Sequence, residues 1–409
     1  MSRSPIALAL TALLAACGPA PRTRAQAAPP PGAAPEETRP PNAHGQVPAF
    51  AGQTRAPRLT NATRFQVTTL AHGLVHPWSL VFLPDGRMLV SERPGRLRIV
   101  GPDGAISVPL AGAPAVASGG QLGLFGLALA PDFATSRQVF MAYAAATPGG
   151  SALTVAHARL SEAGGAARLQ ALTPIFHAEP PRPGTANIGG RLAFAPDGTL
   201  FVTVGDRFQS RDLAQRPDSD LGKVVRIARD GAAPQDNPFV GRAGARPEVW
   251  SLGHRNPEAA AINPWSRRLW IVEHGARGGD EVNIAQAGRN YGWPVITYGE
   301  DYSGAPIGQG TQRAGLEQPI YYWDPVLAPS GMAFYDAGLF PAWRGSLFVG
   351  GLGSQHLARL TLKGDRVVGE EWLLGDLGAR FRDVAVGPDG AIYLLTDEDD
   401  GRILKLTPR

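Results

Sequence analysis

The chain has 409 residues and a formal net charge of +4, with 51 glycines, 38 prolines and 18% charged residues. So many glycines and prolines leave little room for long helices, and a hydrophobic content of 44% can fill a large core, which predicts a turn-rich, all-β protein. Five arginines against two glutamates give residues 1–56 a net charge of +3, which leaves +1 for the remainder. No basic run stands out, so we expect no nucleic-acid partner.

The chain begins with a pattern typical of export. Arg3 precedes an apolar stretch over residues 6–16 that is too short to span a bilayer, which predicts a signal peptide over residues 1–16. The stretch closes on Leu-Ala-Ala-Cys at 14–17, which resembles the lipobox of bacterial lipoproteins; an ordinary cleaved signal with a chance cysteine is the alternative. We expect a periplasmic protein that reaches the membrane only through a lipid on Cys17. Because Cys17 is the only cysteine, a disulfide framework and a zinc–cysteine site are excluded.

A proline-rich segment follows. Residues 18–56 contain nine prolines, several alanines and almost no aliphatic periodicity. Such a segment buries too little apolar surface to order itself, and proline keeps it extended. We therefore predict a disordered tether over residues 17–56 and a folded domain over residues 57–409.

One phrase then recurs six times: an apolar residue, a proline, Asp-Gly or an equivalent turn, and a β-rich run. The prolines are Pro84, Pro131, Pro196, Pro264, Pro341 and Pro388. Each copy joins a tight turn to a strand, with fainter strands between copies, so that four strands fit one blade. Radial repetition protects the sheet edges. The repeats predict one six-bladed β-propeller in place of the two or three domains that the length alone suggests; two β-sandwiches or a β-helix are the alternatives.

Two segments carry chemistry-bearing residues. The carboxylates of residues 273–302, together with glycines that let carbonyls turn inward, suit calcium, although a solvated acidic loop fits equally well. Arg255 and Asn256 lie in the phrase GHRNP, and such a pair either holds an anionic oxygen or forms a plain surface turn. The histidines have no metal-ligand spacing, so zinc is not supported.

A pair of arginines, Arg380 and Arg382, precedes the last repeat. In an extended strand they share a face, and two adjacent guanidiniums need an anion opposite. That anion is either Asp383 or another nearby acidic residue, or the carboxylates of a ligand. The acidic run Asp397–Asp400 is interpreted as a solvated turn that closes the last blade rather than as a cation site.

Taken together, these phrases resemble the glucose/sorbosone dehydrogenase family, which comprises soluble and periplasmic aldose sugar dehydrogenases that use pyrroloquinoline quinone (PQQ). The motifs include SERPGRLRIV at Ser91, GGRLAFAPDGTLFVTVGD at Gly189, GHRNP at Gly253, EHGARGGDEVNI at Glu273, NYGWP at Asn290 and FRDVAVGPDG at Phe381. The resemblance implies a six-bladed propeller, which agrees with the repeat count reached independently. It also implies calcium-assisted oxidation of an aldose by hydride transfer to the quinone in the central pocket.

The resemblance also implies roles for single residues. Those that match the family's cofactor contacts are Gln121, Arg255, Asn256, Thr297, Tyr302, Arg380 and Arg382. Glu281 and Tyr291 match a calcium site. A tethered dehydrogenase of this kind would pass its electrons to a respiratory acceptor.

The proton-transfer site departs from the family pattern. There a histidine takes the proton of the anomeric hydroxyl and an aspartate orients it; the aspartate position is Asp206, but the histidine position holds Asn187. Asparagine cannot act as a general base near neutral pH, although its amide can bond a hydroxyl. Three interpretations follow: a dehydrogenase whose base is Asp206 or a nearby loop carboxylate, a propeller that binds sugar or glycan without oxidising it, or a lactonase-like enzyme with calcium as Lewis acid.

Overall fold

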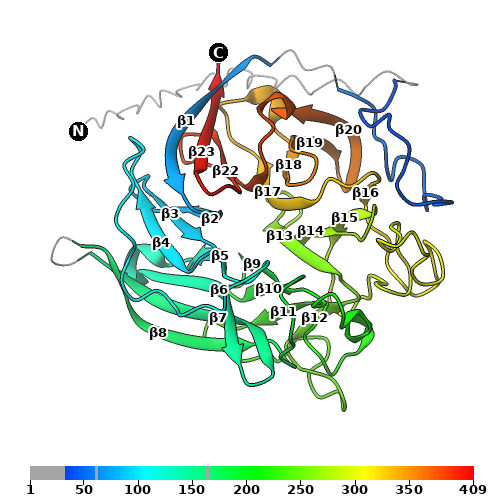
Figure 1. The fold of residues 1–409 in the computed structure, drawn as a ribbon, viewed down its shortest axis with the longest axis horizontal. Coiled ribbons are helices and arrows are strands. Elements are labelled where there is room, and N and C mark those ends of the chain that lie inside the picture. Colours follow the sequence, from blue (N-terminus) through cyan, green and yellow to red (C-terminus); the bar gives the residue numbers. More distant parts are fainter. Residues whose placement is uncertain (1–32, 60–62, 163–165) are drawn as a thin grey trace, which may run out of the picture.

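The computed structural model describes residues 33–59, 63–162 and 166–409. Six β-sheets make up its fold (Figure 1). In each sheet the strands are given from the axis outwards. The first sheet contains β2 (Pro77–Phe82), β3 (Met88–Glu92) and β4 (Arg96–Val100), and the second contains β5 (Leu124–Leu129), β6 (Gln138–Thr147), β7 (Gly150–Ser161) and β8 (Arg168–His177). The third contains β9 (Gly189–Phe194), β10 (Leu200–Val204), β11 (Lys223–Ile227) and β12 (Val249–Leu252). The others are β13 (Asn256–Ile262), β14 (Leu269–His274), β15 (Asp280–Ile284) and β16 (Tyr321–Trp323); β17 (Pro329–Tyr335), β18 (Ser346–Gly351), β19 (Leu357–Lys363) and β20 (Arg366–Leu373); and β21 (Phe381–Val386), β22 (Ile392–Thr396), β23 (Gly401–Pro408) and β1 (Phe65–Leu74).

The sheets are the blades of a propeller. Their innermost strands contact one another in sequence around a closed ring, from β2 through β5, β9, β13 and β17 to β21 and back to β2. The strand β1 pairs antiparallel with β23, so the last blade is built from both ends of the described domain (Figure 1). The predicted six-bladed, all-β fold is confirmed. The helices of the described residues are α1 (Phe133–Ser136), η1 (Arg211–Gln215), η2 (Pro341–Trp343) and η3 (Gly375–Leu377), and none of these is long and apolar enough to cross a membrane.

All six repeated phrases fall at the same place in their blades, the turn between the innermost and the second strand. In three of these turns the aspartate carboxylate accepts a hydrogen bond from the N–H two residues on, at Asp85, Asp197 and Asp389 (3.1, 2.9 and 3.1 Å). The glycine that follows each aspartate has φ of 84°, 85° and 78°, which favours glycine. Local turn chemistry therefore explains why the phrase recurs once in each blade.

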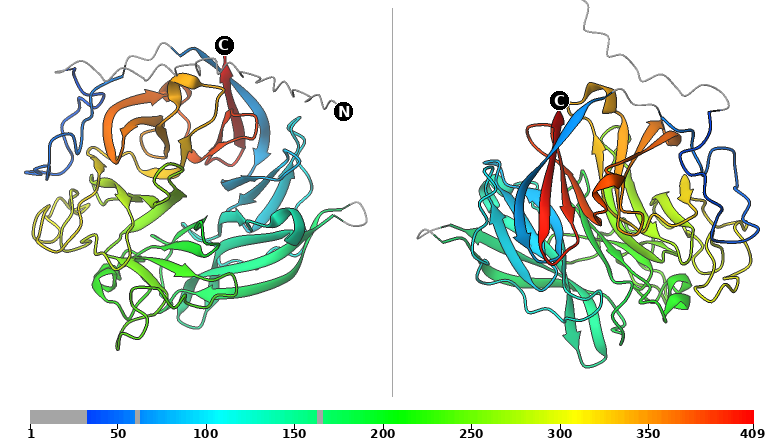
Figure 2. Two further views of the ribbon diagram at one scale, coloured as in Figure 1. Left: turned by 180° about the vertical axis from the view of Figure 1, so that it is seen from behind. Right: turned by 45° about the horizontal axis from the view of Figure 1, so that its top comes forward.

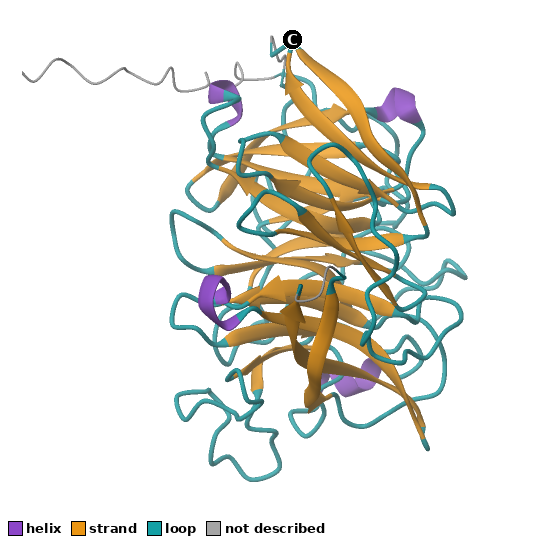
Figure 3. Cartoon of the chain, turned by 90° about the vertical axis from the view of Figure 1, so that its left-hand side faces the viewer, coloured by secondary structure: helices purple, strands orange, loops and turns teal. Residues whose placement is uncertain are grey.

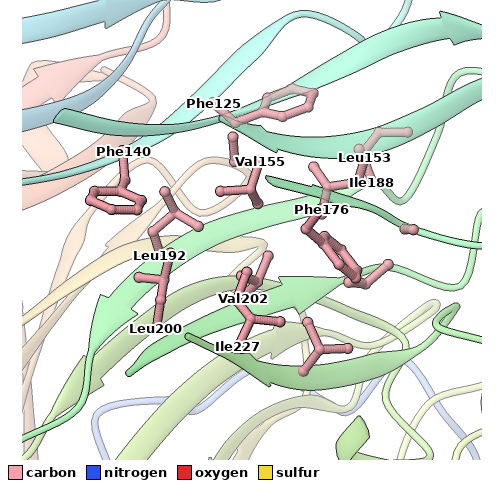
Figure 4. Packing of buried hydrophobic residues seen from close by; sticks show 14 of the residues in the cluster. Phe125, Phe140, Leu153, Val155, Phe176, Ile188, Leu192, Leu200, Val202 and Ile227 are labelled. Carbon is pink, nitrogen blue, oxygen red and sulfur yellow. The ribbon is translucent and has the colours of Figure 1, made fainter. Parts of the chain in front are cut away.

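The core lies in layers between adjacent blades. Figure 4 shows one layer, in which Phe125 and Phe140 of the second blade meet Leu192 and Val202 of the third. Strands packed between two such layers are buried on both faces, as is β10 along its whole length. Such strands read as continuous apolar runs because neither face meets water.

The first blade departs from the predicted four strands. Its described sheet ends at β4, beyond which an irregular segment takes the outer position. There the N–H groups of Ser107 and Leu110 donate to the carbonyls of Ile99 and Leu97, both at 2.9 Å. These bonds cover the edge of β4 without a regular strand, which blunts an otherwise open sheet edge.

The prediction of disorder over residues 17–56 is wrong for residues 33–56. Residues 33–59, here called the N-terminal strap, lie beside β16 and the long loop before it (dark blue and yellow in Figures 1 and 2). The fully buried Gln53 donates to the carbonyl of Pro319 (2.8 Å) and accepts from the hydroxyl of Tyr298 (2.9 Å). Composition indicates disorder because the segment has few apolar side chains, but hydrogen bonds to the propeller hold it instead.

Backbone groups hold the rest of the strap. Both oxygens of Asp324 accept from strap N–H groups, those of Asn42 (2.7 Å) and Ala43 (3.1 Å), while the Arg55 guanidinium donates to the Asp324 carbonyl (2.9 Å). The N–H of Ala56 donates to the hydroxyl of Tyr321 at 2.9 Å. The predicted signal peptide and Cys17 lie outside the described residues.

Candidate functional site

A cavity of about 190 Å³ lies on the propeller axis, where the innermost strands begin. Its walls combine the starts of innermost strands, such as β2 and β21, with residues that follow second strands, such as Arg93 after β3 and Asp397 after β22. Antiparallel neighbours bring these ends together, so the cavity lies at the end opposite the repeated turns. Figure 3 shows loops at both ends of the strands.

Two more cavities adjoin the axial one. A cavity of about 290 Å³, here called the outer cavity, lies between Asp206, Arg255, Trp293 and Tyr302. A cavity of about 10 Å³, here called the small cavity, is also lined by Arg255 and Trp293, and it shares His274 with the axial cavity. The small cavity therefore lies between the other two, sharing Arg255 with the outer cavity and His274 with the axial one.

The predicted arginine pair faces the axial cavity. The buried Arg382 contacts Glu258 and Asp397, both at 2.6 Å, and its Nε has no acceptor among the described residues. The Arg380 side chain is 46% exposed and lies 3.6 Å from Asp397. The anion opposite Arg382 thus comes from the protein, whereas Arg380, whose Nη1 donates to the Leu352 carbonyl (3.1 Å), has a half-exposed side chain at the cavity wall.

The nearest acidic residue in the sequence, Asp383, has a different partner. Its carboxylate accepts from the buried Arg191 (2.9 Å) and from the N–H of Leu80 (2.9 Å). The acidic run predicted to be a solvated turn is likewise only partly so, because Asp397 is buried and bonds Arg382. Both contacts join residues of different strands or blades, which sequence order does not reveal.

Arg255 lies directly before the innermost strand β13. Its guanidinium carbon lies 5.4 Å from the centre of the Trp293 ring, and Nη1 donates weakly to the carbonyl of His274 (3.4 Å). No carboxylate lies within salt-bridge distance of this guanidinium in the described part of the chain. A buried guanidinium with no direct carboxylate partner, facing two cavities, is suited to hold an anionic oxygen.

Asn256, predicted beside Arg255 as a cofactor contact, is bonded within the protein at both ends of its amide. Its Oδ1 accepts from the N–H of Gly189 (2.9 Å), and its Nδ2 donates to Glu258 (3.0 Å). With both atoms engaged and only 2% of the residue exposed, Asn256 orients Glu258.

Asn187 and Asp206 meet as expected of a proton-transfer pair. Asn187 Nδ2 donates to Asp206 Oδ1 at 2.9 Å, and Trp293 Nε1 donates to Asp206 Oδ2 at 2.7 Å. Burial raises the pKa of Asp206, against the attraction of Arg255. Asn187 has φ of 53°, a backbone conformation that asparagine tolerates better than most residues. The pair is rigidly held, and the carboxylate faces the outer cavity.

The remaining predicted contacts are divided among the three cavities. Gln121 lines the axial cavity and accepts from the N–H of Asn187 at 2.7 Å. Thr297 lines the small cavity, and its hydroxyl accepts from the N–H of Gly299 at 3.1 Å. Tyr302 lines the outer cavity, 62% exposed, with its ring 6.4 Å from that of Phe208.

Glu281 and Tyr291, the predicted calcium ligands, both line the small cavity. Glu281 lies opposite Glu273 in the register of β14 and β15. Burial, and next the Glu273 carboxylate, raise the pKa of Glu281 well above its usual range. The hydroxyl of Tyr291 is engaged by the Ile284 carbonyl and the Gln286 N–H, which leaves its backbone carbonyl as the atom it can offer a cation.

The sequence patterns missed several wall residues of the axial cavity: Trp78, Arg93, Glu258, His274 and Asp397. A signal existed for one of them, since Glu258 follows Asn256 by two positions in β13 and so shares its face. The others come from strand ends and the residues that follow them on different blades, and only the closed ring brings them together.

A family model described as Glucose / Sorbosone dehydrogenase matches residues 74–405. The chain belongs to the glucose/sorbosone dehydrogenase family. It is 45% identical over 347 residues to the Escherichia coli aldose sugar dehydrogenase YliI, covering 84% of this chain and 93% of that protein. This membership confirms the resemblance inferred from the motifs, and it removes the fold analogy on which the lactonase interpretation rested.

Solved structures agree with the assignment to the glucose/sorbosone dehydrogenase family. A crystal structure of a glucose dehydrogenase is 52% identical with a TM-score of 0.81, covering 83% of this chain and 99% of that one. The PQQ-bound form of an aldose sugar dehydrogenase from Streptomyces coelicolor is 30% identical with a TM-score of 0.70, covering 86% and 100%. A family member of this fold therefore binds PQQ.

Proposed function

We propose that this chain oxidises aldose sugars with PQQ as cofactor and calcium as a structural cation. The observation that carries the proposal is Arg255, a buried guanidinium with no carboxylate within salt-bridge distance among the described residues, which lines both the outer and the small cavity. The PQQ-bound relative supports the choice of cofactor. Asp206 attracts this guanidinium without bonding it, so its donors remain available to an anion.

The axial cavity suits a planar polycarboxylate quinone. Arg380 opens a guanidinium to it, the buried Nε of Arg382 has no acceptor among the described residues, and Trp78 supplies an aromatic wall. These groups offer charge-assisted hydrogen bonds to carboxylates. When bound, PQQ supplies the two-electron acceptor for the hydride that the sugar loses. Arg255 supplies the positive charge that stabilises an oxygen on which negative charge develops.

The small cavity suits one cation. Its volume of about 10 Å³ is close to that of one water-sized sphere. The paired carboxylates of Glu273 and Glu281 repel each other, and Oδ1 of the buried Asn283 has no donor among the described residues. No cluster of three or more His, Cys, Asp or Glu in the described part of the chain has a metal-binding arrangement, so further ligands would be Thr297 and backbone carbonyls. Calcium accepts such a mixed oxygen set.

The outer cavity suits the sugar. Tyr302 and Phe208 present exposed rings on one side, and Trp293 lies deeper. Aromatic faces pack against the apolar C–H faces of a pyranose, while Asp206 presents a carboxylate to the same cavity. A ligand held between them lies beside Arg255, which this cavity shares with the small cavity.

Asp206 is the proton acceptor in this proposal. The proton of the anomeric hydroxyl passes to Asp206, whose pKa is raised by burial toward the working pH, which improves a general base. With Nδ2 of Asn187 committed to Asp206, its Oδ1 remains to accept a hydrogen bond from a sugar hydroxyl. Proton and hydride leave the same carbon–oxygen unit, so the aldose is oxidised by two electrons.

The experiment is reconstitution of the purified protein with PQQ and calcium, followed by dye reduction over a panel of aldoses. Asp206→Asn should abolish turnover and leave the dissociation constant for PQQ within about threefold. An Asp206→Asn variant as active as the parent protein would show that the base lies elsewhere, and failure of the parent protein to bind PQQ would refute the proposal.

A second candidate function is favoured by Asn187, which replaces the family's base: a protein that binds sugar or glycan without oxidising it. PQQ binding without turnover, together with activity in Asn187→His, would support this alternative. Turnover by the parent protein that Asn187→His does not increase would exclude it.

We also propose that the chain is exported and lipid-anchored through Cys17, from which it would pass electrons to a respiratory acceptor. The lipobox-like sequence supports this, since one early cation and a short apolar stretch precede the cysteine. Expression in cells fed radiolabelled palmitate should label the parent protein but not Cys17→Ala. Equal labelling, or none in either protein, would refute the anchor.

A further inference from the structure

Arg93 lines the axial cavity, although neither the repeated phrases nor the family resemblance assigns it a role. It follows β3 directly and lines the cavity together with Gln121 and Arg380. Its backbone is fixed on both sides, since its N–H donates to the carbonyl of His76 (3.0 Å) and its carbonyl accepts from the N–H of Leu124 (2.9 Å). The side chain therefore starts from a rigid point in the cavity wall.

A glycine makes room for this side chain. A Cβ placed on Gly123 would lie 2.1 Å from the Arg93 carbonyl oxygen and 2.6 Å from its Cγ, and Gly123 has φ of 149°. At the far end, Nη1 of Arg93 donates to the carbonyl of Gly120 at 2.9 Å. The stem is thus packed against one glycine while the head is anchored on another, which limits the positions the guanidinium can adopt.

The charge of Arg93 is not neutralised by the protein. Its neighbours Arg96 and Arg98 share the carboxylate of Glu92, but no carboxylate lies within 4 Å of Arg93 among the described residues. The two carboxylates that line the axial cavity, Glu258 and Asp397, both bond Arg382. Asp397 also lies 3.6 Å from Arg380, so Arg93 is the lining arginine with no carboxylate within 4 Å among the described residues, while Arg380 and the Nε of Arg382 keep donors for a ligand beside it.

We propose that Arg93 is a cofactor-binding residue that forms, with Arg380, a two-arginine clamp for separate carboxylates of the quinone. This rests on the proposed function, because it assigns the ligand of the axial cavity to PQQ. Two guanidiniums from different blades favour a ligand with at least two carboxylates over a monoanion, since each can make charge-assisted bonds to a different group. The clamp thereby selects a polycarboxylate.

The test is titration of the cofactor-free protein with PQQ, followed by quenching of tryptophan fluorescence, to which Trp78 in the cavity wall contributes. Losing a charge-assisted contact should raise the dissociation constant roughly 10- to 100-fold in Arg93→Ala. Arg93→Gln keeps a donor for the Gly120 carbonyl but no charge, and should weaken binding similarly. Arg344→Ala, at a surface ion pair with Asp336, is the matched control and should bind as the parent protein does.

A second ligand separates charge recognition from loss of shape. The trimethyl ester of PQQ lacks the carboxylate charges, so Arg93→Ala should cost its binding less than threefold. An equal loss with ester and acid would overturn the clamp, because Arg93 would then act through packing. If the parent protein binds PQQ and both Arg93 variants bind as tightly, the clamp is refuted while the proposed function stands. If the parent protein does not bind PQQ, both fail.

Discussion

Replacing Glu258 with glutamine tests the ionic network beneath the axial cavity. Glu258 bonds Arg382 at 2.6 Å, accepts from Asn256 at 3.0 Å and lies 3.5 Å from His274. Burial alone would raise the pKa of Glu258, but the attraction of His274 and Arg382 with these bonds lowers it from 4.5 to about 2. The amide keeps the shape and removes the charge, so the change isolates the electrostatic contribution.

The lowered pKa sets both the size and the pH dependence of the effect. A fall from 4.5 to about 2 corresponds to about 3 kcal/mol of folding free energy at pH 7. Because the unfolded chain binds this proton at higher pH than the folded chain, the contribution is complete above the unfolded value and is lost as pH falls toward the folded value. We expect Glu258→Gln to lower the free energy of unfolding by about 3 kcal/mol at pH 7 and by about 1.5 kcal/mol at pH 3.

The assay is urea unfolding of both proteins at the two pH values, followed by circular dichroism. Groups outside this network titrate alike in both chains, so the difference between the two proteins reports Glu258 together with the charges it contacts. Asp336→Asn, at a surface pair with Arg344, should change stability by less than about 1 kcal/mol at either pH. A Glu258→Gln difference that is the same at pH 7 and pH 3 would refute the reasoning, because the charge of Glu258 would then contribute nothing.

Three more expectations concern the strap, a buried lysine and the small cavity. Gln53→Ala should lower the free energy of unfolding by about 2 kcal/mol, since it leaves the Pro319 carbonyl without its donor, and a urea titration matching the parent would contradict this. Lys223 Nζ donates to the carbonyls of Leu213, Ala214 and Leu221 (2.8, 3.0 and 2.7 Å), so Lys223→Met should cost about 3 kcal/mol in the same assay. Millimolar calcium should raise the Tm of the parent protein but not that of Glu281→Gln, as differential scanning calorimetry would show; equal shifts would place the ion elsewhere.

The blades were predictable because their signals are local. The aspartate at positions such as Asp85 and Asp197 bonds the N–H two residues on, and the next glycine adopts positive φ, all within a few residues. The shared face of Arg380 and Arg382 was predictable for the same reason, because the period of two is a property of one strand. Six copies in order then imply a closed ring, since that arrangement protects every sheet edge.

The N-terminal strap was not predictable from composition. Its prolines and its shortage of aliphatic residues indicate disorder, and that inference assumes that only apolar burial orders a chain. Long-range hydrogen bonds are the factor that this assumption omits. Gln53 and Asp324 each bond a partner more than 200 residues away in the sequence. Such pairs leave no periodic trace in the segment itself.

The sequence by itself determined the blade count, the side of the strand on which the arginine pair lies, and the replacement of the family's base by Asn187. The tertiary structure alone decided which charges are already paired. Arg382 meets Glu258, which is 124 residues earlier, whereas Arg93, which lines the same cavity, meets no carboxylate within 4 Å among the described residues. The physical reason is that strand period and turn chemistry act between neighbours, whereas charge compensation depends on distance in space, which only the closure of the ring establishes.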